Sequence, residues 1–423
     1  MKIFKKIITL ILCLAVLSSS LMLSSCMYIL KGERDKDYIT KEELDAALSG
    51  ILAGDVTVEG GDNYDITVEG ADRTIAAASK SLLSAVSVIC SFTVQGSGIG
   101  KTSTAYSAGS GVIYKLDKNK GEAYVITNYH VVYNNSAVGT NKISEDISLY
   151  LYGMESADYK ISATYVGGSM QYDLAVLKVD GSRILTESNA APAVFANSND
   201  IAVLDTAIAV GNPESDGISA TVGYVNVDSE YVVLNFTDTT GPVEVELRVM
   251  RIDTAVNSGN SGGGLYNSEG ELIGIVNAKM TDSENIGYAI PSNIVKYVTD
   301  NIIYYCDGKD AKTPYRALVG ITVKANRMYT EVDPEDGSIH KREDVVVDAV
   351  NKGAVAEGHL LAGDIIKSIE IDGTSYEVTR IFMVVDSMLN ARAGSTVTFK
   401  ILREGAEMSV TLTIPEEALT AWK

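Results

Sequence analysis

Residues 257–265 read N-S-G-N-S-G-G-G-L, and this short stretch decides how the rest of the chain is interpreted. The alternating run 243–252 before it and the apolar run 271–276 after it each predict a strand. Glycine is required where the backbone takes a positive φ or closely approaches a neighbour. A serine on such a turn can present its hydroxyl beside backbone N–H groups, which is what acyl transfer requires. The same composition is also typical of a simple hairpin turn.

A serine hydroxyl is a weak nucleophile without a base, so Ser261 needs a histidine. The chain has three histidines, and His130 stands in T-N-Y-H-V-V, directly after the strand-like residues 123–126. Asp173 opens the apolar run D-L-A-V-L-K-V and is the best candidate for the carboxylate that orients the imidazole. Each of these residues alone is more often structural than catalytic, so the hypothesis depends on all three together.

The motifs T-N-x-H-V-V, D-L-A-V-L-K-V and D-T-A-V-N-S-G-N-S-G-G-G-L resemble those of the HtrA (DegP/DegS-like) family of trypsin-fold serine proteases in type, order and spacing. The resemblance covers about residues 80–415. It implies a mainly β fold, in which a trypsin-like double β-barrel with its site between the barrels precedes a PDZ-like α+β domain. It further implies that Ser261 attacks the scissile carbonyl, that His130 is the general base, and that Asp173 orients it.

The resemblance also implies an oxyanion hole and a primary specificity pocket. The hole would be formed by Gly259, Asn260 and Ser261, with the N–H groups of the first and last as donors. In the trypsin fold the residue six before the nucleophile lies at the base of the pocket, and here it is Ala255. A buried cation without a partner would cost several kcal/mol, so a small apolar side chain is expected before the cut. Asp253, the nearest acid, is not expected to reach the pocket. The opposite wall is expected from Ile286, Gly287, Tyr288 and Ala289.

Length and composition predict two or three soluble domains. The chain has 423 residues, of which 46% are hydrophobic and 21% charged. Its 35 basic against 55 acidic residues give a net charge of −20, which argues against nucleic acid as a partner. Short strand-like runs recur through residues 76–305 and predict an all-β sandwich or barrel, which the resemblance assigns to the protease domain. Within it, the Gly/Ser/Thr-rich residues 95–107 are expected to form a surface loop, and residues 291–305 a helix.

The first 75 residues read as targeting and spacing segments. Residues 1–25 combine three early lysines with a short apolar run, as a signal peptide does. L-S-S-C, ending at Cys26, resembles a bacterial lipobox and implies a lipoprotein anchored to the cell membrane outside the cytoplasm. An uncleaved anchor or an ordinary signal peptide is the alternative. Residues 26–75 read as an acidic stalk, because six acids and no base between residues 50 and 72 would keep it extended.

The last hundred residues divide into a linker at 306–315, a PDZ-like domain at 316–415 and a tail at 416–423. Residues 354–366, A-V-A-E-G-H-L-L-A-G-D-I-I, loosely resemble a PDZ element. A PDZ groove takes an extended peptide as an added strand. By the same resemblance a C-terminal carboxylate would meet backbone N–H groups at Leu318, Val319, Gly320 and Ile321. A structural strand that binds nothing is the alternative.

The remaining expectations concern cofactors, thiols and partners. With three histidines and no H-E-x-x-H, neither a metal nor another cofactor is expected. Cys90 and Cys306 are expected to be buried free thiols rather than a disulfide. The resemblance implies unfolded or extended polypeptides as substrates, and a homotrimer. Two other function classes stay open: a chaperone-like scaffold that binds peptides without cutting them, and a non-proteolytic serine hydrolase.

Overall fold

The computed structural model describes residues 56–59, 65–68, 73–96, 100–139, 142–277, 286–334 and 337–422. The expected signal peptide, Cys26 and most of the expected acidic stalk lie outside these residues. Within the stalk, β1 (Val56–Glu59) and β2 (Asp65–Val68) form a two-stranded sheet. None of the helices in the described ranges combines the length and the apolar character needed to cross a membrane.

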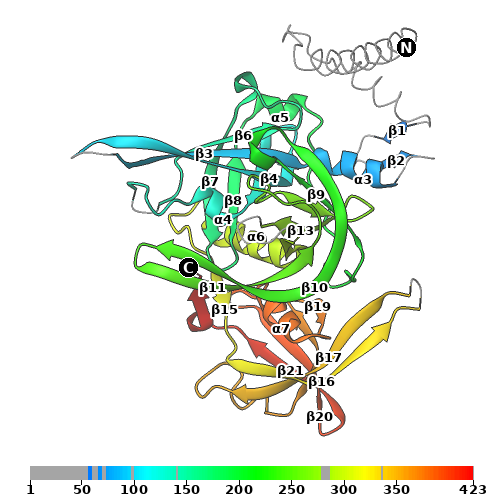
Figure 1. Cartoon of the computed structure of the whole chain (residues 1–423). Coiled ribbons are helices and arrows are strands. Elements are labelled where there is room, and N and C mark those ends of the chain that lie inside the picture. Colours follow the sequence, from blue (N-terminus) through cyan, green and yellow to red (C-terminus); the bar gives the residue numbers. More distant parts are fainter. Residues whose placement is uncertain are drawn as a thin grey trace, which may run out of the picture. The chain divides into compact units, whose positions relative to one another are not determined.

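The first half of the protease region is a closed six-stranded barrel (Figure 1). Its strands pair in the order β3-β4-β5-β8-β7-β6, and alternate side chains point into an apolar core. Two short helices, α4 (Tyr129–Val132) and α5 (Arg183–Glu187), follow β5 and β8, and a 3₁₀ turn covers Ala157–Tyr159. The strands are β3 (Ala85–Gln95), β4 (Thr102–Asp117), β5 (Glu122–Thr127), β6 (Asp146–Leu151), β7 (Ile161–Ser169) and β8 (Leu174–Val179).

The second half is another closed barrel, ordered β10-β11-β14-β13-β12-β9. The strands predicted on either side of the Ser261 turn are β11 and β13, and the short β12 lies between them in the chain. The expected helix is α6 (Ser292–Cys306), and α3 (Arg73–Leu82) precedes the first barrel. The strands are β9 (Thr206–Gly211), β10 (Ser219–Asp238), β11 (Gly241–Ile252), β12 (Gly264–Tyr266), β13 (Leu272–Val276) and β14 (Gly287–Pro291).

The expected surface loop at residues 95–107 is wrong, because β4 begins at Thr102. It pairs with β3 as far as Gln95↔Thr102 and Thr93↔Thr104. The first seven residues of β4 are all exposed or only partly buried. Their Ser and Thr side chains therefore reflect a hairpin that extends beyond the barrel into solvent, and not an irregular backbone.

The last part of the chain builds a separate sheet in the order β16-β17-β18-β20-β21, with β19 paired to β18, around its own apolar core. One helix, α7 (Ile381–Met388), accompanies it. The strands are β15 (Tyr315–Ala317), β16 (Ile321–Val332), β17 (Ile339–Val350), β18 (Ile365–Ile371), β19 (Thr374–Glu377), β20 (Thr396–Arg403), β21 (Ala406–Thr413) and β22 (Leu419–Ala421).

Two expected boundaries in this part need correction. The linker 306–315 is shorter than expected, because Cys306 ends α6 and Tyr315 begins β15. The expected tail at 416–423 is structured through residue 422: a 3₁₀ turn covers Glu416–Ala418, and β22 pairs with β15. Trp422 is buried and packs on Tyr172, with ring centroids 5.1 Å apart. The strand pairing and this buried aromatic side chain together hold the segment in place.

Candidate active site

His130 and Asp173 are brought together by the pairing of β5 with β8. His130 lies in α4, which follows β5, and Asp173 directly precedes β8; the strands pair at Thr127↔Ala175. The imidazole Nδ1 is 2.7 Å from Asp173 Oδ2, and the backbone N–H of His130 donates to Asp173 Oδ1 at 2.9 Å. The carboxylate is fully buried. It therefore fixes the ring through one oxygen and the backbone of the same residue through the other.

Asp173 itself is held by residues that the sequence did not single out. Its φ of 48° lies in the left-handed region, and its carbonyl accepts from Asn128 Nδ2 at 2.8 Å and from the Tyr129 N–H at 3.1 Å. The Asn277 side chain, from the end of β13 in the other barrel, donates to Asp173 Oδ2 at 2.8 Å. Nothing in the local pattern marks Asn277, which is the first residue after an apolar strand. Only the closure of both barrels places it beside the carboxylate.

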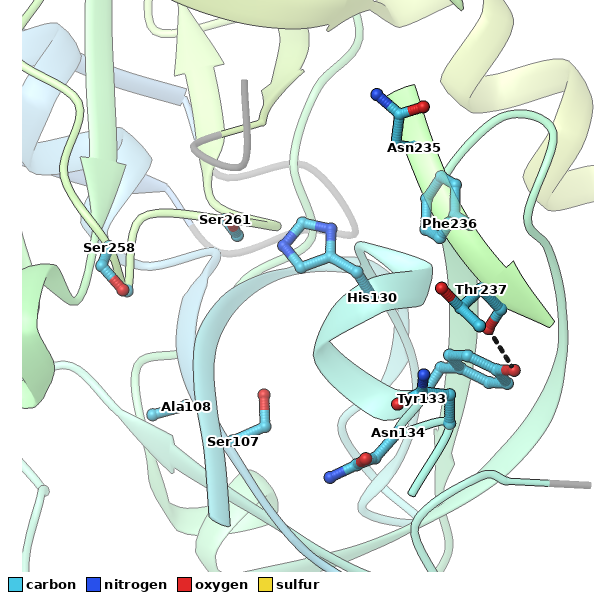
Figure 2. A pocket seen from close by; sticks show the side chains of 12 residues that line it. Ser107, Ala108, His130, Tyr133, Asn134, Asn235, Phe236, Thr237, Ser258 and Ser261 are labelled. Carbon is cyan, nitrogen blue, oxygen red and sulfur yellow. Dashed lines mark hydrogen bonds between the residues drawn. The ribbon is translucent and has the colours of Figure 1, made fainter. Parts of the chain in front are cut away.

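Ser261 lies on the turn between β11 and β12, and His130 and Ser261 face the same pocket (Figure 2). Both residues are described, and no hydrogen bond joins the Ser261 hydroxyl to the imidazole. In enzymes without substrate this bond is often long and forms fully only when substrate binds. The place of Ser261 in the lining of this pocket, beside His130, is therefore compatible with a nucleophile.

Gly259 takes a left-handed backbone conformation on the Ser261 turn. Its φ is 99°, and an added Cβ would lie 2.2 Å from the Asn212 carbonyl oxygen, so only glycine fits. The carbonyl of Ser258 accepts from the Glu214 N–H at 2.8 Å. Because a trans peptide points its C=O and N–H in opposite directions, this bond directs the Gly259 N–H away from Glu214.

The pocket beside these residues has a volume of about 480 Å³. One wall comes from β10, and the Tyr133 hydroxyl donates to the Thr237 carbonyl at 2.9 Å, the dashed line in Figure 2. The sequence missed this wall, although residues 231–236 read Y-V-V-L-N-F, because a strand pattern does not show which site the strand will border. The pocket is lined by Ser107, Ala108, His130, Tyr133, Asn134, Asn135, Asn235, Phe236, Thr237, Ser258, Gly259 and Ser261.

The residues expected for the primary specificity pocket lie on two adjoining segments outside this lining. Ala255 is exposed, and its neighbour Val256 is close to Gly287, where an added Cβ would be 2.9 Å from a Val256 methyl. Gly287, Tyr288 and Ala289 pair with β11, and Ile286 directly precedes them. Asp253 Oδ1 accepts from the Tyr224 N–H at 2.6 Å, so this acid is bound to the β10 backbone.

Residues 109–275 match the family model for the trypsin-like peptidase domain. Over 317 residues the chain is 33% identical to the protein described as "Serine protease Do-like HtrA" of Bacillus subtilis (strain 168), an alignment covering 72% of this chain and 63% of that protein. The chain belongs to the HtrA family. All three motif residues of this HtrA-family chain, His130, Asp173 and Ser261, lie within the matched domain.

A second relative is the "Periplasmic serine endoprotease DegP" of Escherichia coli (strain K12), 30% identical over 333 residues, or 76% of this chain and 60% of that protein. The HtrA-family chain thus spans about three fifths of the length of these curated relatives. A solved structure described as "HtrA-type protease AlgW with decapeptide" aligns with 81% of this chain and 98% of that chain, at 24% identity and a TM-score of 0.47.

The residues expected to bind a C-terminal carboxylate are only partly available. The Leu318 N–H donates to the Ala418 carbonyl at 2.9 Å, so this amide is already occupied and the expectation is wrong for Leu318. Val319 is buried, and its carbonyl accepts from the Ala356 N–H at 3.0 Å. Gly320 has a φ of 77°, and Ile321 begins β16. The N–H groups of Val319 and Gly320 remain candidates for a carboxylate.

Proposed function

We propose that this chain is a serine endopeptidase that cleaves polypeptides through an acyl-enzyme. The observation that carries the proposal is the buried Asp173 carboxylate 2.7 Å from His130, at a pocket that Ser261 also lines. His130 takes the proton of the Ser261 hydroxyl as the oxygen attacks the scissile carbonyl, and then gives it to the leaving amine. Asp173 holds Nδ1 protonated, so that Nε2 is free to accept the proton, and it stabilises the imidazolium that forms.

The tetrahedral intermediate would be stabilised by the backbone N–H groups of Gly259 and Ser261, on either side of Asn260. The positive φ of Gly259 and the outward-turned Ser258 carbonyl support this role for the Gly259 N–H. Such donors act where charge develops in the transition state, so their effect falls on kcat. No metal or cofactor takes part in any of these steps.

The proposed substrates are unfolded or extended polypeptides with a small apolar residue before the cut. Asp253, the one acid near Ala255 in the chain, is bound to the Tyr224 N–H, which supports rejection of Lys and Arg. An apolar pocket discriminates by only ~1–3 kcal/mol per methylene, so the preference would be loose. Mass spectrometry of the cut sites in reduced casein tests this, and enrichment of Lys or Arg before the cut would overturn it.

The same proposal includes a lipid anchor at Cys26 that holds the protease outside the cytoplasm. L-S-S-C after the apolar run supports it, and Cys26 lies outside the described residues. Two acyl chains would anchor the protein stably where one would not. We expect Cys26→Ser to abolish labelling by radioactive palmitate and to change processing. Equal labelling and equal membrane retention of the variant would exclude the anchor.

We further propose that residues 316–415 bind exposed C-termini of polypeptides. From the family resemblance we also propose that the chain assembles as a homotrimer. The left-handed turn at Gly320, just before β16, supports peptide capture. Titrating the full chain with a hydrophobic-ended peptide and with its C-terminal amide tests this, since carboxylate capture predicts weaker binding of the amide. Equal affinity for the peptide and its amide would count against carboxylate capture. Sedimentation velocity tests the homotrimer by reporting the oligomeric state.

The experiment that tests the function is cleavage of reduced casein by the full chain and by its Ser261→Ala variant. We expect fragments with the wild type and none with the variant. Labelling by a fluorophosphonate probe identifies the reactive serine independently of peptide cleavage. Binding of casein without cleavage would support the chaperone-like scaffold, and turnover of a small ester without casein cleavage a non-proteolytic hydrolase.

A further inference from the structure

Ser110 stands where the first barrel meets the Ser261 turn. It belongs to β4, is 1% exposed, and is fixed by its own backbone. Its N–H donates to the Ser261 carbonyl at 2.8 Å, and its carbonyl accepts from the Thr127 hydroxyl at 2.7 Å. An added Cβ on Gly262 would lie 2.2 Å from this carbonyl oxygen, so the turn packs directly against Ser110.

The Ser110 hydroxyl makes two further hydrogen bonds that join three segments of the chain. It donates to the Gly259 carbonyl at 2.7 Å and accepts from the Asn212 N–H at 2.8 Å. Gly259 precedes the nucleophile by two residues, and Asn212 directly follows β9 of the second barrel. A hydroxyl has a single proton to donate, and here that proton goes to Gly259. The buried Ser110 hydroxyl therefore holds the Ser261 turn through a polar contact that neither the turn nor the segment after β9 can supply itself.

These contacts fix the peptide planes around Gly259. The plane between Ser258 and Gly259 is held by the Glu214 N–H on the Ser258 carbonyl, and the plane between Gly259 and Asn260 is held by the Ser110 hydroxyl. Ser110 also holds the Ser261 carbonyl through its N–H. With both planes that flank Gly259 fixed, its φ of 99° and the direction of its N–H are fixed as well.

We propose that Ser110 is a positioning residue for the oxyanion hole, whose hydroxyl keeps the Gly259 N–H aimed at the developing oxyanion. The inference rests on the proposed function of Ser261 and Gly259. Ser110 touches no substrate in this role and acts only through the Gly259 peptide. Its loss leaves the His130–Asp173 pair untouched, because neither residue hydrogen-bonds to the Ser110 side chain.

The test compares Ser110→Ala with a matched control in the full chain. Ser144→Ala is the control, because the Ser144 hydroxyl is also buried in the first barrel and shares its one proton between the Ser91 and Asp146 carbonyls, at 2.8 and 2.9 Å. Both variants lose one buried hydroxyl, and only the first loses contact with the Ser261 turn. Tm measures the structural cost of each change.

The readout is the rate at which a fluorophosphonate phosphonylates Ser261, together with kcat and KM on a peptide substrate. In phosphonylation Ser261 Oγ bonds to phosphorus, fluoride leaves, and His130 takes the hydroxyl proton, while the phosphoryl oxygen occupies the oxyanion hole. For Ser110→Ala we expect both the labelling rate and kcat to fall about 10-fold or more, short of the ~10²–10³-fold cost of losing an oxyanion donor. KM and the acid limb of the pH–rate profile should stay unchanged, and Ser144→Ala should keep the wild-type rates.

A labelling rate for Ser110→Ala within twofold of wild type would overturn the proposal, even if its Tm fell as much as that of Ser144→Ala. Equal loss of rate in both variants would also overturn it, since general destabilisation would explain both. If the wild type labels at Ser261 but cleaves no peptide, the proposed function fails while the comparison of labelling rates still decides the role of Ser110.

Discussion

Asp173→Asn is the substitution whose effect the structure defines most closely. The carboxylate accepts three hydrogen bonds: at Oδ2 from the His130 ring and from Asn277, and at Oδ1 from the His130 backbone N–H. An asparagine amide supplies one acceptor oxygen and one NH₂ donor, so each of its two orientations puts a donor against a donor. With NH₂ toward the ring, Nδ1 must become the acceptor, and the proton moves to Nε2, where it blocks the base. With NH₂ toward the backbone, the ring keeps its tautomer but loses the charge that stabilises imidazolium.

The magnitude follows from those contacts. Replacing a hydrogen bond to a charged acceptor costs about 1.5–3 kcal/mol, and a buried donor without a partner about 1–3 kcal/mol. Together they raise the barrier by about 3–6 kcal/mol and lower kcat about 10²- to 10⁴-fold. KM should change little, because the substrate does not touch Asp173.

The assay is kcat and KM on a chromogenic peptide for wild type, Asp173→Asn and Asp146→Asn. Asp146 is an exposed carboxylate of the same barrel that accepts from Ser91 and Lys160, so its variant should keep the wild-type kcat. The reasoning predicts that neither orientation of the amide keeps kcat within about tenfold of wild type. A kcat for Asp173→Asn inside that range would therefore refute it.

Three further predictions concern the groups around this centre. Gly259→Ala should lower kcat by about 10²-fold or more, because the alanine Cβ would lie 2.2 Å from the Asn212 carbonyl oxygen and the backbone N–H of residue 259 must turn away. A rate near wild type on the same peptide would exclude an oxyanion role for this N–H. Asn277→Ala should lower kcat about 10- to 100-fold through loss of its bond to Asp173, and an unchanged rate would make that bond merely structural. Burial raises the pKa of Cys90 to about 12 and that of Cys306 to about 11. Both free thiols should therefore resist iodoacetamide at pH 8 until the chain is unfolded. Rapid alkylation of either thiol in the folded protein, followed by mass spectrometry, would contradict this.

The parts of the site that the sequence predicted are those with a local signature. His130, Asp173 and Ser261 each lie at the end of an apolar run or on a glycine-rich turn, and strand pattern and turn chemistry are both read over a few residues. The recurring short strands predicted an all-β domain, and the resemblance to the HtrA family implied its division into two barrels. The hairpin of β3 and β4 was not predicted, because polar side chains are typical of an exposed strand as well as of a loop.

The residues that the sequence missed are fixed by contacts between segments far apart in the chain. Asn277 reaches Asp173 across 104 positions, and Ser110 reaches Gly259 across 149. Asn277 follows β13 and Ser110 lies within β4, and neither local pattern differs from that of an ordinary strand. Trp422 was assigned to a tail for the same reason, since it is buried against Tyr172, which lies far away in the chain. Such roles appear only once the barrels have closed.

The central claim is that Ser261 and His130 act as one catalytic unit, and a double-alanine cycle tests it most directly. The measurement is kcat on one peptide substrate for Ser261→Ala, His130→Ala and the double variant, prepared as the full chain with Tm as a check on folding. We predict that either single change lowers kcat by about 10⁶-fold and that the double variant is little worse, because removing one member disables the other. Retention of about a tenth of the wild-type rate by Ser261→Ala, or losses that multiply in the double variant, would contradict the claim.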